Sequence, residues 1–188
     1  MNLMKKTTTR DLCLCAMFAA LTAVGAFIKI PVPVCPFTLQ LTFTTLAGLL
    51  LGKKYGTLAV AVYVILGFIG VPIFTQGGGP GYIMQPTFGY LLGFIVGTFL
   101  TGLIAEGSPA PSMKRLLVAS FTGLVTVYLA GMVYLYLLCN YVLGSPIGVA
   151  KVFMTCFVLI APGDIVLNIA ACFLAKRLIP ILRRSRES

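Results

Sequence analysis

Asp164 is the residue whose type and position most strongly suggest chemistry in this sequence. The chain has four acidic residues, and Asp164 lies about 16 residues into the last long apolar segment, on the order of 24 Å if that segment is an unbroken helix. A carboxylate in such apolar surroundings is costly, and it is a functional-site hypothesis by default. The first question is therefore what this carboxylate holds.

Two roles for Asp164 follow from its neighbours. Asn168 comes four residues later, so on a helix the two side chains share one face. An acceptor beside an amide suits a neutral ligand group that carries N–H donors and a carbonyl. In the alternative role, Pro162 and Gly163 break the helix and Asp164 caps the part that resumes, because aspartate readily accepts free backbone N–H groups at a helix start. The two roles can coexist.

Other polar side chains are concentrated in the connections between apolar segments. The longest connection, residues 74–90, contains glycines, aromatic residues and the amides Gln76 and Gln85, and Gln40 follows an earlier proline-rich connection. Loops of this composition often carry ligand-binding residues. For any one of these glutamines taken alone, a hydrogen bond within the loop is the better explanation.

The composition argues against several other kinds of chemistry. The chain has no histidine, its six cysteines include no Cys-x-x-Cys pair, and no two carboxylates stand together for acid–base catalysis. The glycine-rich stretch after Gln76 lacks the Gly-Lys-Ser/Thr of a phosphate-binding loop. We therefore expect no metal, no bound cofactor and no enzymatic activity.

The elements that must position Asp164 are membrane helices. Hydrophobic residues make up 59% of the chain and charged residues 10%, whereas about 25% of residues are charged in a typical soluble domain. The apolar runs are continuous and approach the ~20 residues that a helix needs to cross a bilayer. We predict a single all-α membrane domain, residues 1–188, whose six transmembrane helices span about 11–30, 38–52, 55–71, 88–105, 115–139 and 148–178.

The distribution of lysine and arginine predicts the orientation. If the N-terminus is cytoplasmic, 12 of the 14 cations fall on the cytoplasmic side and only Lys29 and Lys151 fall outside. Cytoplasmic loops of membrane proteins carry an excess of Lys and Arg, so we expect both termini to be cytoplasmic and the number of spans to be even. The same placement explains the net charge of +10 without nucleic-acid binding.

The first apolar segment contains two pairs of small residues four positions apart, Ala16 with Ala20 and Ala19 with Ala23. Small residues allow helices to approach closely in a membrane. Packing inside this protein explains the pattern, and so does a docking face for another membrane subunit. The spacing alone leaves both interpretations open.

Four stretches, taken in order, resemble the BioY family: Pro31–Gln40 (PVPVCPFTLQ), Leu46–Gly52 (LAGLLLG), Gln85–Phe94 (QPTFGYLLGF) and Ala161–Asp164 (APGD). The resemblance covers almost the whole chain. It implies the six-helix fold of the substrate-binding (S) component of an energy-coupling factor (ECF) transporter, with an outward-facing pocket for biotin. It also implies a multi-pass protein of a prokaryotic cell membrane, driven by a transmembrane coupling subunit and two cytoplasmic ATPase subunits.

The resemblance also implies roles for residues. It puts Asp164 and Tyr90 in the pocket under the connection that begins at Phe74, makes the first connection a lid, and makes the small residues of the first helix a docking face. With the polar residues above, the candidate biotin-binding residues are Asp164, Tyr90, Asn168, Gln40, Gln76, Gln85, Thr87 and Phe74. The lid candidates are Pro33, Pro36 and Thr38, and the docking candidates are Ala16, Ala19, Ala20 and Ala23.

Two positions depart from the family pattern. Leu167 stands where the pattern has a lysine three residues after the aspartate, and Phe88-Gly89 replaces a double glycine after Pro-Thr. Asn168 does not take the place of that lysine, because one position further along a helix means about 100° around it. A polar ligand contact is therefore missing or is supplied from elsewhere.

Biotin has an apolar thiophane and valeryl body, a ureido ring with two N–H donors, and a carboxylate tail. We expect Asp164 to accept the ureido N–H groups and the tail to lie toward the outer mouth, near Lys29, Lys151 or loop N–H groups. Other functions stay open: a stand-alone biotin facilitator, an S component for a related small vitamin, or a structural subunit in which Asp164 only caps a helix. A transferase acting on lipid precursors is disfavoured, because no paired acids or histidines face the cytoplasm.

Overall fold

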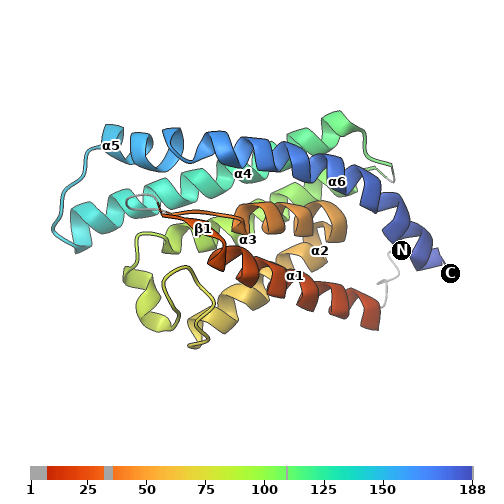
Figure 1. The fold of residues 1–188 in the computed structure, drawn as a ribbon, viewed down its shortest axis with the longest axis horizontal. Coiled ribbons are helices and arrows are strands. Elements are labelled where there is room, and N and C mark those ends of the chain that lie inside the picture. Colours follow the sequence, from red (N-terminus) through yellow and green to blue (C-terminus); the bar gives the residue numbers. More distant parts are fainter. Residues whose placement is uncertain (1–7, 32–35, 109, 188) are drawn as a thin grey trace, which may run out of the picture.

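The computed structural model describes residues 8–31, 36–108 and 110–187, which form a bundle of six α-helices with one short β-ribbon (Figure 1). This confirms the predicted all-α fold. Most of the long helices follow the long axis of the molecule, and α1 begins at the end where α6 finishes. The helices are α1 (Thr9–Phe27), α2 (Gln40–Phe68), α3 (Phe88–Glu106), α4 (Met113–Leu137), α5 (Val149–Phe153) and α6 (Ala161–Glu187).

Helix α2 bends sharply at Gly52 and folds back on itself. Gly52 has φ +77° and ψ −175°, a conformation that is essentially restricted to glycine. The amide of Gln40 donates to the hydroxyl of Tyr63 across 23 residues, at 2.6 Å, although an unbroken helix would separate these residues by about 35 Å. The two limbs, residues 40–51 and 53–68, correspond to the predicted spans 38–52 and 55–71.

The last predicted span, 148–178, is interrupted. Helix α5 continues through a π-helical turn, Met154–Val158, and α6 begins at Ala161 after a turn at residues 159–160. Pro162 falls in the first turn of α6, where its missing N–H costs nothing. Asp164 also lies in this first turn, so the interruption brings it to the start of a helix inside the bundle.

A two-stranded antiparallel ribbon forms where the first predicted span was expected to end. Strand β1 (Lys29–Ile30) pairs with β2 (Phe37–Thr38), so that Lys29 lies opposite Thr38 and Ile30 opposite Phe37. The predicted helix 11–30 therefore ends earlier, at Phe27. The ribbon connects α1 to α2 and lies over their ends, where it forms part of a cavity wall.

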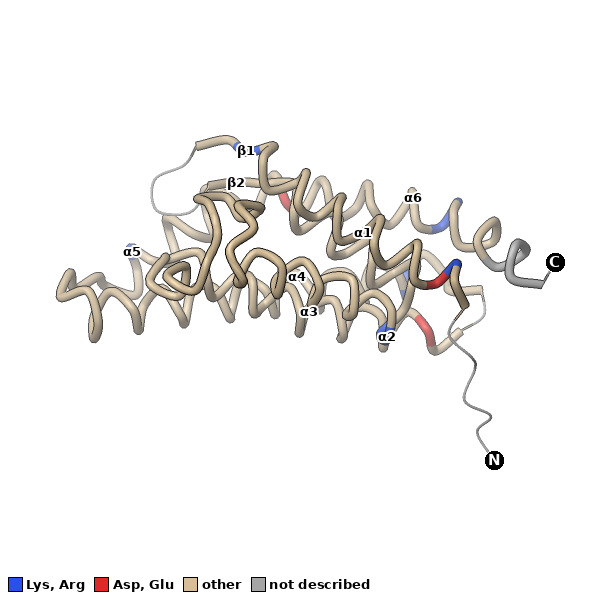
Figure 2. The backbone as a smooth tube through the Cα atoms, turned by 90° about the horizontal axis from the view of Figure 1, so that it is seen from below, with Lys and Arg blue, Asp and Glu red and all other residues tan. Residues whose placement is uncertain are grey.

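Apolar and charged residues divide the surface as a membrane protein requires. In the described ranges, five segments are long and apolar enough to cross a bilayer, judged by length and composition: α1, α2 counted through its bend, α3, Met113–Val142 and Ala161–Leu182. Figure 2 shows most charged residues of the described ranges gathered where α1 begins and α6 finishes. Lys29 on β1 and Lys151 on α5 lie toward the opposite end.

Two other carboxylates have structural partners at the charged end. The carboxylate of Asp11 accepts from the backbone and the hydroxyl of Thr8, which is the N-cap of α1. Glu106 accepts from the backbone N–H of Lys53 at 3.1 Å, beside the bend in α2. Neither contact resembles the setting of Asp164, which lies near the other end.

Candidate functional site

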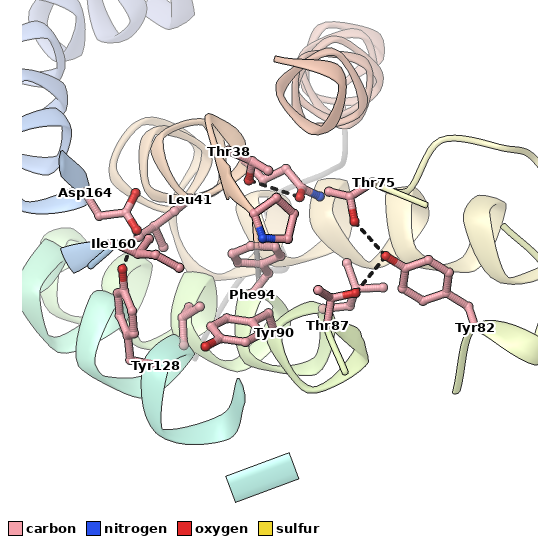
Figure 3. A pocket seen from close by; sticks show the side chains of 14 residues that line it. Thr38, Leu41, Thr75, Tyr82, Thr87, Tyr90, Phe94, Tyr128, Ile160 and Asp164 are labelled. Carbon is pink, nitrogen blue, oxygen red and sulfur yellow. Dashed lines mark hydrogen bonds between the residues drawn. The ribbon is translucent and has the colours of Figure 1, made fainter. Parts of the chain in front are cut away.

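The β-ribbon forms part of the wall of a cavity, whose lining side chains are drawn in Figure 3. The ribbon lies toward the end of the bundle that carries few charges (Figure 2). The volume of the cavity is about 50 Å³, smaller than the roughly 300–1,000 Å³ typical of small-molecule sites, so a bound ligand would require the walls to move apart. Residues from the ribbon, α2, α3, α4, α6 and the connection before α3 line it. They are Pro36, Thr38, Gln40, Leu41, Thr75, Tyr82, Thr87, Tyr90, Leu91, Phe94, Val127, Tyr128, Ile160 and Asp164.

Asp164 forms one polar side of the cavity together with Tyr128 of α4. Only 6% of the Asp164 surface is exposed, and its Oδ2 accepts a hydrogen bond from the Tyr128 hydroxyl at 2.5 Å. Oδ1 is buried and has no hydrogen-bond partner in the described part of the chain. A buried acceptor without a donor is costly, so Asp164 is available to receive a donor from a ligand.

The capping role is not what the carboxylate does. Helix α6 starts three residues before Asp164, and the side-chain contact goes to Tyr128 on another helix instead of to the backbone of α6. The Asp164 backbone N–H donates to the carbonyl of Ile160 at 3.3 Å. The sequence was therefore right that the helix is interrupted here, but the break does not need the carboxylate as its cap.

A chain of hydroxyl groups forms the opposite side of the cavity. The Tyr82 hydroxyl lies 2.8 Å from Oγ1 of Thr75 and 2.9 Å from Oγ1 of Thr87. Lys29 of the ribbon adds a cation here, because its Nζ donates to the carbonyl oxygen of Thr75 at 2.8 Å. Figure 3 shows this chain separated from Asp164 by the aromatic ring of Phe94.

Gln40 lies where the ribbon meets α2. Its Nε2 donates to the Tyr63 hydroxyl, which in turn donates to the carbonyl of Ile73 at 3.1 Å, and its Oε1 accepts from the Thr38 hydroxyl at 3.2 Å. Gln40 is 3% exposed. These bonds fix its orientation and attach the ribbon to the cavity wall.

The ribbon also touches the segment that carries Asp164. A Cβ atom on Gly163 would lie 2.9 Å from a ring carbon of Phe37 on β2, so the ring packs directly against the residue before Asp164. Of the lid candidates, Pro36 and Thr38 line the cavity. The third, Pro33, lies outside the described residues.

The structure brings together half of the predicted biotin-binding residues. Asp164, Tyr90, Gln40 and Thr87 line the cavity. The other four lie outside its lining: Gln76 is exposed, Gln85 is half-buried, Phe74 packs between the rings of Tyr63 and Tyr82, and Asn168 is buried further along α6.

Asn168 differs from the other residues outside the lining. It is 2% exposed, and neither its amide nitrogen nor its oxygen has a hydrogen-bond partner in the described ranges. It shares a helix face with Asp164, as the spacing predicted. Its burial one turn further into the bundle keeps it out of the cavity wall.

Several lining residues were not predicted. Tyr128, Tyr82 and Thr75 supply hydroxyl groups, and Phe94 supplies an aromatic surface. A tyrosine inside an apolar span is a usable signal, because its buried hydroxyl normally needs a partner. The identity of that partner depends on helix packing, which the sequence does not display.

The site contains no arrangement for metal binding. Among the described residues, no three His, Cys, Asp or Glu side chains lie close enough together to hold an ion. The cavity instead offers one carboxylate, neutral hydroxyl and amide groups, and apolar walls. This combination suits non-covalent capture of an amphipathic small molecule.

Comparisons with known proteins agree on one family. The sequence profile of the BioY family matches residues 2–184. The chain is 44% identical to a protein of Lysinibacillus sphaericus described as "Probable biotin transporter BioY", over 98% of this chain and 94% of that one. It is 47% identical to the biotin transporter BioY of Thermotoga maritima, over 65% of this chain and 72% of that one.

A solved structure resembles the whole fold. It is the S-component for biotin from an ECF-type ABC transporter, which superposes with a TM-score of 0.78 and is 26% identical in sequence. The match covers 92% of this chain and 94% of that structure.

Proposed function

This chain belongs to the BioY family, and from that premise we propose that its cavity binds biotin through Asp164. The protein is a multi-pass membrane component of biotin uptake, the S component of an ECF-type transporter. It is a binding subunit and not an enzyme. The observation that carries the site assignment is the buried Oδ1 of Asp164, which lacks a donor in the described structure.

The ureido ring of biotin is the part that suits Asp164. Its two N–H groups are donors, and a carboxylate accepts such bonds at about twice the strength of a neutral acceptor. Tyr128 already holds Oδ2, so the free Oδ1 keeps a fixed position before the ligand arrives. A preformed acceptor reduces the ordering cost of binding.

The apolar part of biotin suits the middle of the cavity. Leu41, Leu91, Phe94, Val127 and Ile160 supply an apolar surface between the Asp164 side and the hydroxyl side. Burial of the thiophane ring and valeryl chain against these walls would contribute about 25 cal/mol per Å² of apolar surface removed from water.

Access to the cavity would depend on the β-ribbon. Pro36 and Thr38 line the cavity from the ribbon, and Phe37 packs on Gly163. Movement of the ribbon would therefore open the mouth and release this contact. We place the cavity on the outer side of the membrane, because the opposite end carries most of the cations, as cytoplasmic ends do.

The chain has no phosphate-binding motif of its own, so we assign ATP hydrolysis to partner subunits. We propose a transmembrane coupling subunit and two cytoplasmic ATPase subunits, with the coupling subunit docked on α1. Ala16 and Ala20 are exposed on that helix, Ala23 is half-buried and Ala19 is buried. The exposed pair is the better docking candidate.

The first experiment is a titration of the purified, detergent-solubilised protein with biotin, in parallel with Asp164→Asn. The substitution keeps the shape and removes the charged acceptor, so we expect affinity to fall about a hundredfold or more. Glu106→Gln is the matched control, because it makes the same chemical change at the opposite end of the bundle and should leave affinity unchanged.

The possible results separate the assignments. A folded wild-type protein that binds no biotin would show that the ligand is wrong. Tight binding that survives in Asp164→Asn would show that the carboxylate is not the recognition group, and the hydroxyl side of the cavity would become the candidate.

A further inference from the structure

We infer that Lys29 recognises the carboxylate end of the ligand at the rim of the cavity. This inference rests on the proposed function, because it takes biotin as the ligand, and it assigns a specificity-determining residue that the cavity lining does not include. It also selects one of the two outer cations that the sequence left open.

The ribbon directs the Lys29 side chain toward the cavity. Lys29 pairs with Thr38 in the antiparallel ribbon, and residues directly opposite one another in such a pair project from the same face, with Cβ atoms about 4.5–5.5 Å apart. Thr38 lines the cavity. The side chain of Lys29 therefore leaves the ribbon on the face that covers the ligand site.

A hydrogen bond fixes the far end of the same side chain. Nζ donates to the carbonyl oxygen of Thr75 at 2.8 Å, and Thr75 lines the cavity from the other direction. The side chain thus runs from its place opposite Thr38 in the ribbon to the backbone of Thr75. It has three N–H donors, and the structure assigns one of them to Thr75, which leaves donors for an anion.

The charges of the cavity favour this orientation of the ligand. Asp164 lies on the opposite side from Thr75 (Figure 3), and a carboxylate repels the anionic tail of biotin. The tail therefore points away from Asp164, toward the hydroxyl side where Lys29 supplies a cation. Lys29 is exposed at this rim, so an anion can reach it without a buried ion pair.

Lys151 is the other cation toward this end, and its position excludes it from this role. It lines a separate apolar groove with Pro86, Leu135 and Ile147, and it is absent from the lining of the Asp164 cavity. Lys151 is therefore a matched control that has the same charge, lies toward the same end of the bundle and does not line the cavity.

The test compares biotin with biotinamide, in which the carboxylate is replaced by a neutral primary amide. Wild type, Lys29→Met, Lys29→Arg and Lys151→Met are titrated with both ligands in detergent. We expect wild type to prefer biotin over biotinamide by about tenfold, the scale of one charge-assisted contact at a partly exposed site. Lys29→Met should lose this preference, whereas Lys29→Arg and Lys151→Met should keep it.

The ligand pair separates recognition from a purely mechanical role of Lys29. If the Lys29–Thr75 bond only holds the ribbon down, Lys29→Met would weaken both ligands by the same factor, and the inference would be wrong. Equal affinity of wild type for the two ligands, or a preference that persists in Lys29→Met, would also overturn it. A wild-type chain that binds neither ligand overturns the biotin assignment first.

Discussion

Tyr128 orients the carboxylate on which the proposed recognition depends. Its hydroxyl donates to Oδ2 of Asp164 at 2.5 Å, and its ring packs edge-on against Tyr90 and Phe157, with centroids 6.2 and 5.4 Å apart. The ring contacts fix the hydroxyl, and the hydroxyl fixes the carboxylate. The contributions of the ring and of the hydroxyl can be separated, because a phenylalanine at position 128 keeps the ring and lacks only the hydroxyl.

We predict that Tyr128→Phe folds normally and binds biotin more weakly. A hydrogen bond to a charged group contributes about 1.5–3 kcal/mol, which corresponds to a roughly ten- to hundredfold loss of affinity. Calorimetric titration of the purified variant with biotin measures this loss of affinity. Tyr141→Phe is the control, since Tyr141 is 76% exposed. Unchanged binding in Tyr128→Phe would show that Asp164 needs no support from α4.

The residues that sequence reasoning identified and those it missed differ in one physical respect. Asp164 could be found because the cost of a carboxylate in an apolar span is a property of the local sequence. Tyr128 could not be assigned, because its partner lies 36 residues away and depends on the rotation of two helices. Gln76 and Asn168 have suitable polar groups, but loop path and helix depth keep them out of the lining.

At the scale of elements, glycine and proline predicted where the chain turns but not the form of each turn. The predicted spans 38–52 and 55–71 meet just after Gly52, and the structure places the reversal at this residue. Pro162 predicted an interruption near Asp164, yet α6 begins before the proline, at Ala161. The ribbon was not predicted, because its two strands are only two residues long and have no alternating pattern to recognise.

We predict that Gly52→Ala destabilises the protein more than Gly70→Ala does. Both glycines have positive φ, +77° and +118°, and each substitution should cost about 1–3 kcal/mol in backbone strain. At Gly52 the new Cβ would also collide with the carboxylate of Glu106, which caps the bend by accepting from Lys53, whereas nothing lies within 4 Å at Gly70.

Thermal unfolding in detergent measures this difference. The midpoint should fall further for Gly52→Ala, and biotin affinity of the protein that remains folded should be unaffected, because the bend lies far from the cavity. Equal decreases of the unfolding midpoint in the two variants would show that Glu106 moves aside without cost. Backbone conformation alone would then explain why position 52 is a glycine.

At the scale of the whole molecule, the two ends of the bundle differ in charge and in whether they hold the cavity. The cavity, the ribbon and two cations lie toward one end, and most charged residues lie at the other, where α1 begins and α6 finishes. Composition and charge placement predicted this division, because both depend on totals over long segments and tolerate errors in helix boundaries. Which face of α1 would meet a partner depends on the rotation of that helix about its axis, which composition and charge placement do not determine.

The structure divides the four small residues of α1 into two groups. Ala19 is 7% exposed and belongs to the same buried core cluster as Leu41 and Val60, so a larger side chain there should disturb folding. Ala20 is exposed on the outer face of the same helix. We predict that Ala20→Trp leaves biotin binding intact and abolishes biotin uptake, because the bulky ring prevents close approach of a partner helix.

Two assays on the same variant decide between docking and internal packing. Uptake of labelled biotin is followed in cells that supply the coupling and ATPase subunits, and affinity is measured on the purified protein. Val125→Trp is the matched control, since Val125 is 49% exposed on α4 and offers no small surface for a helix to approach. Loss of uptake in Ala20→Trp alone, with binding retained in both variants, places the partner on α1. Uptake that survives in Ala20→Trp would move the docking surface to another helix, and parallel loss of binding would make Ala20 a packing position.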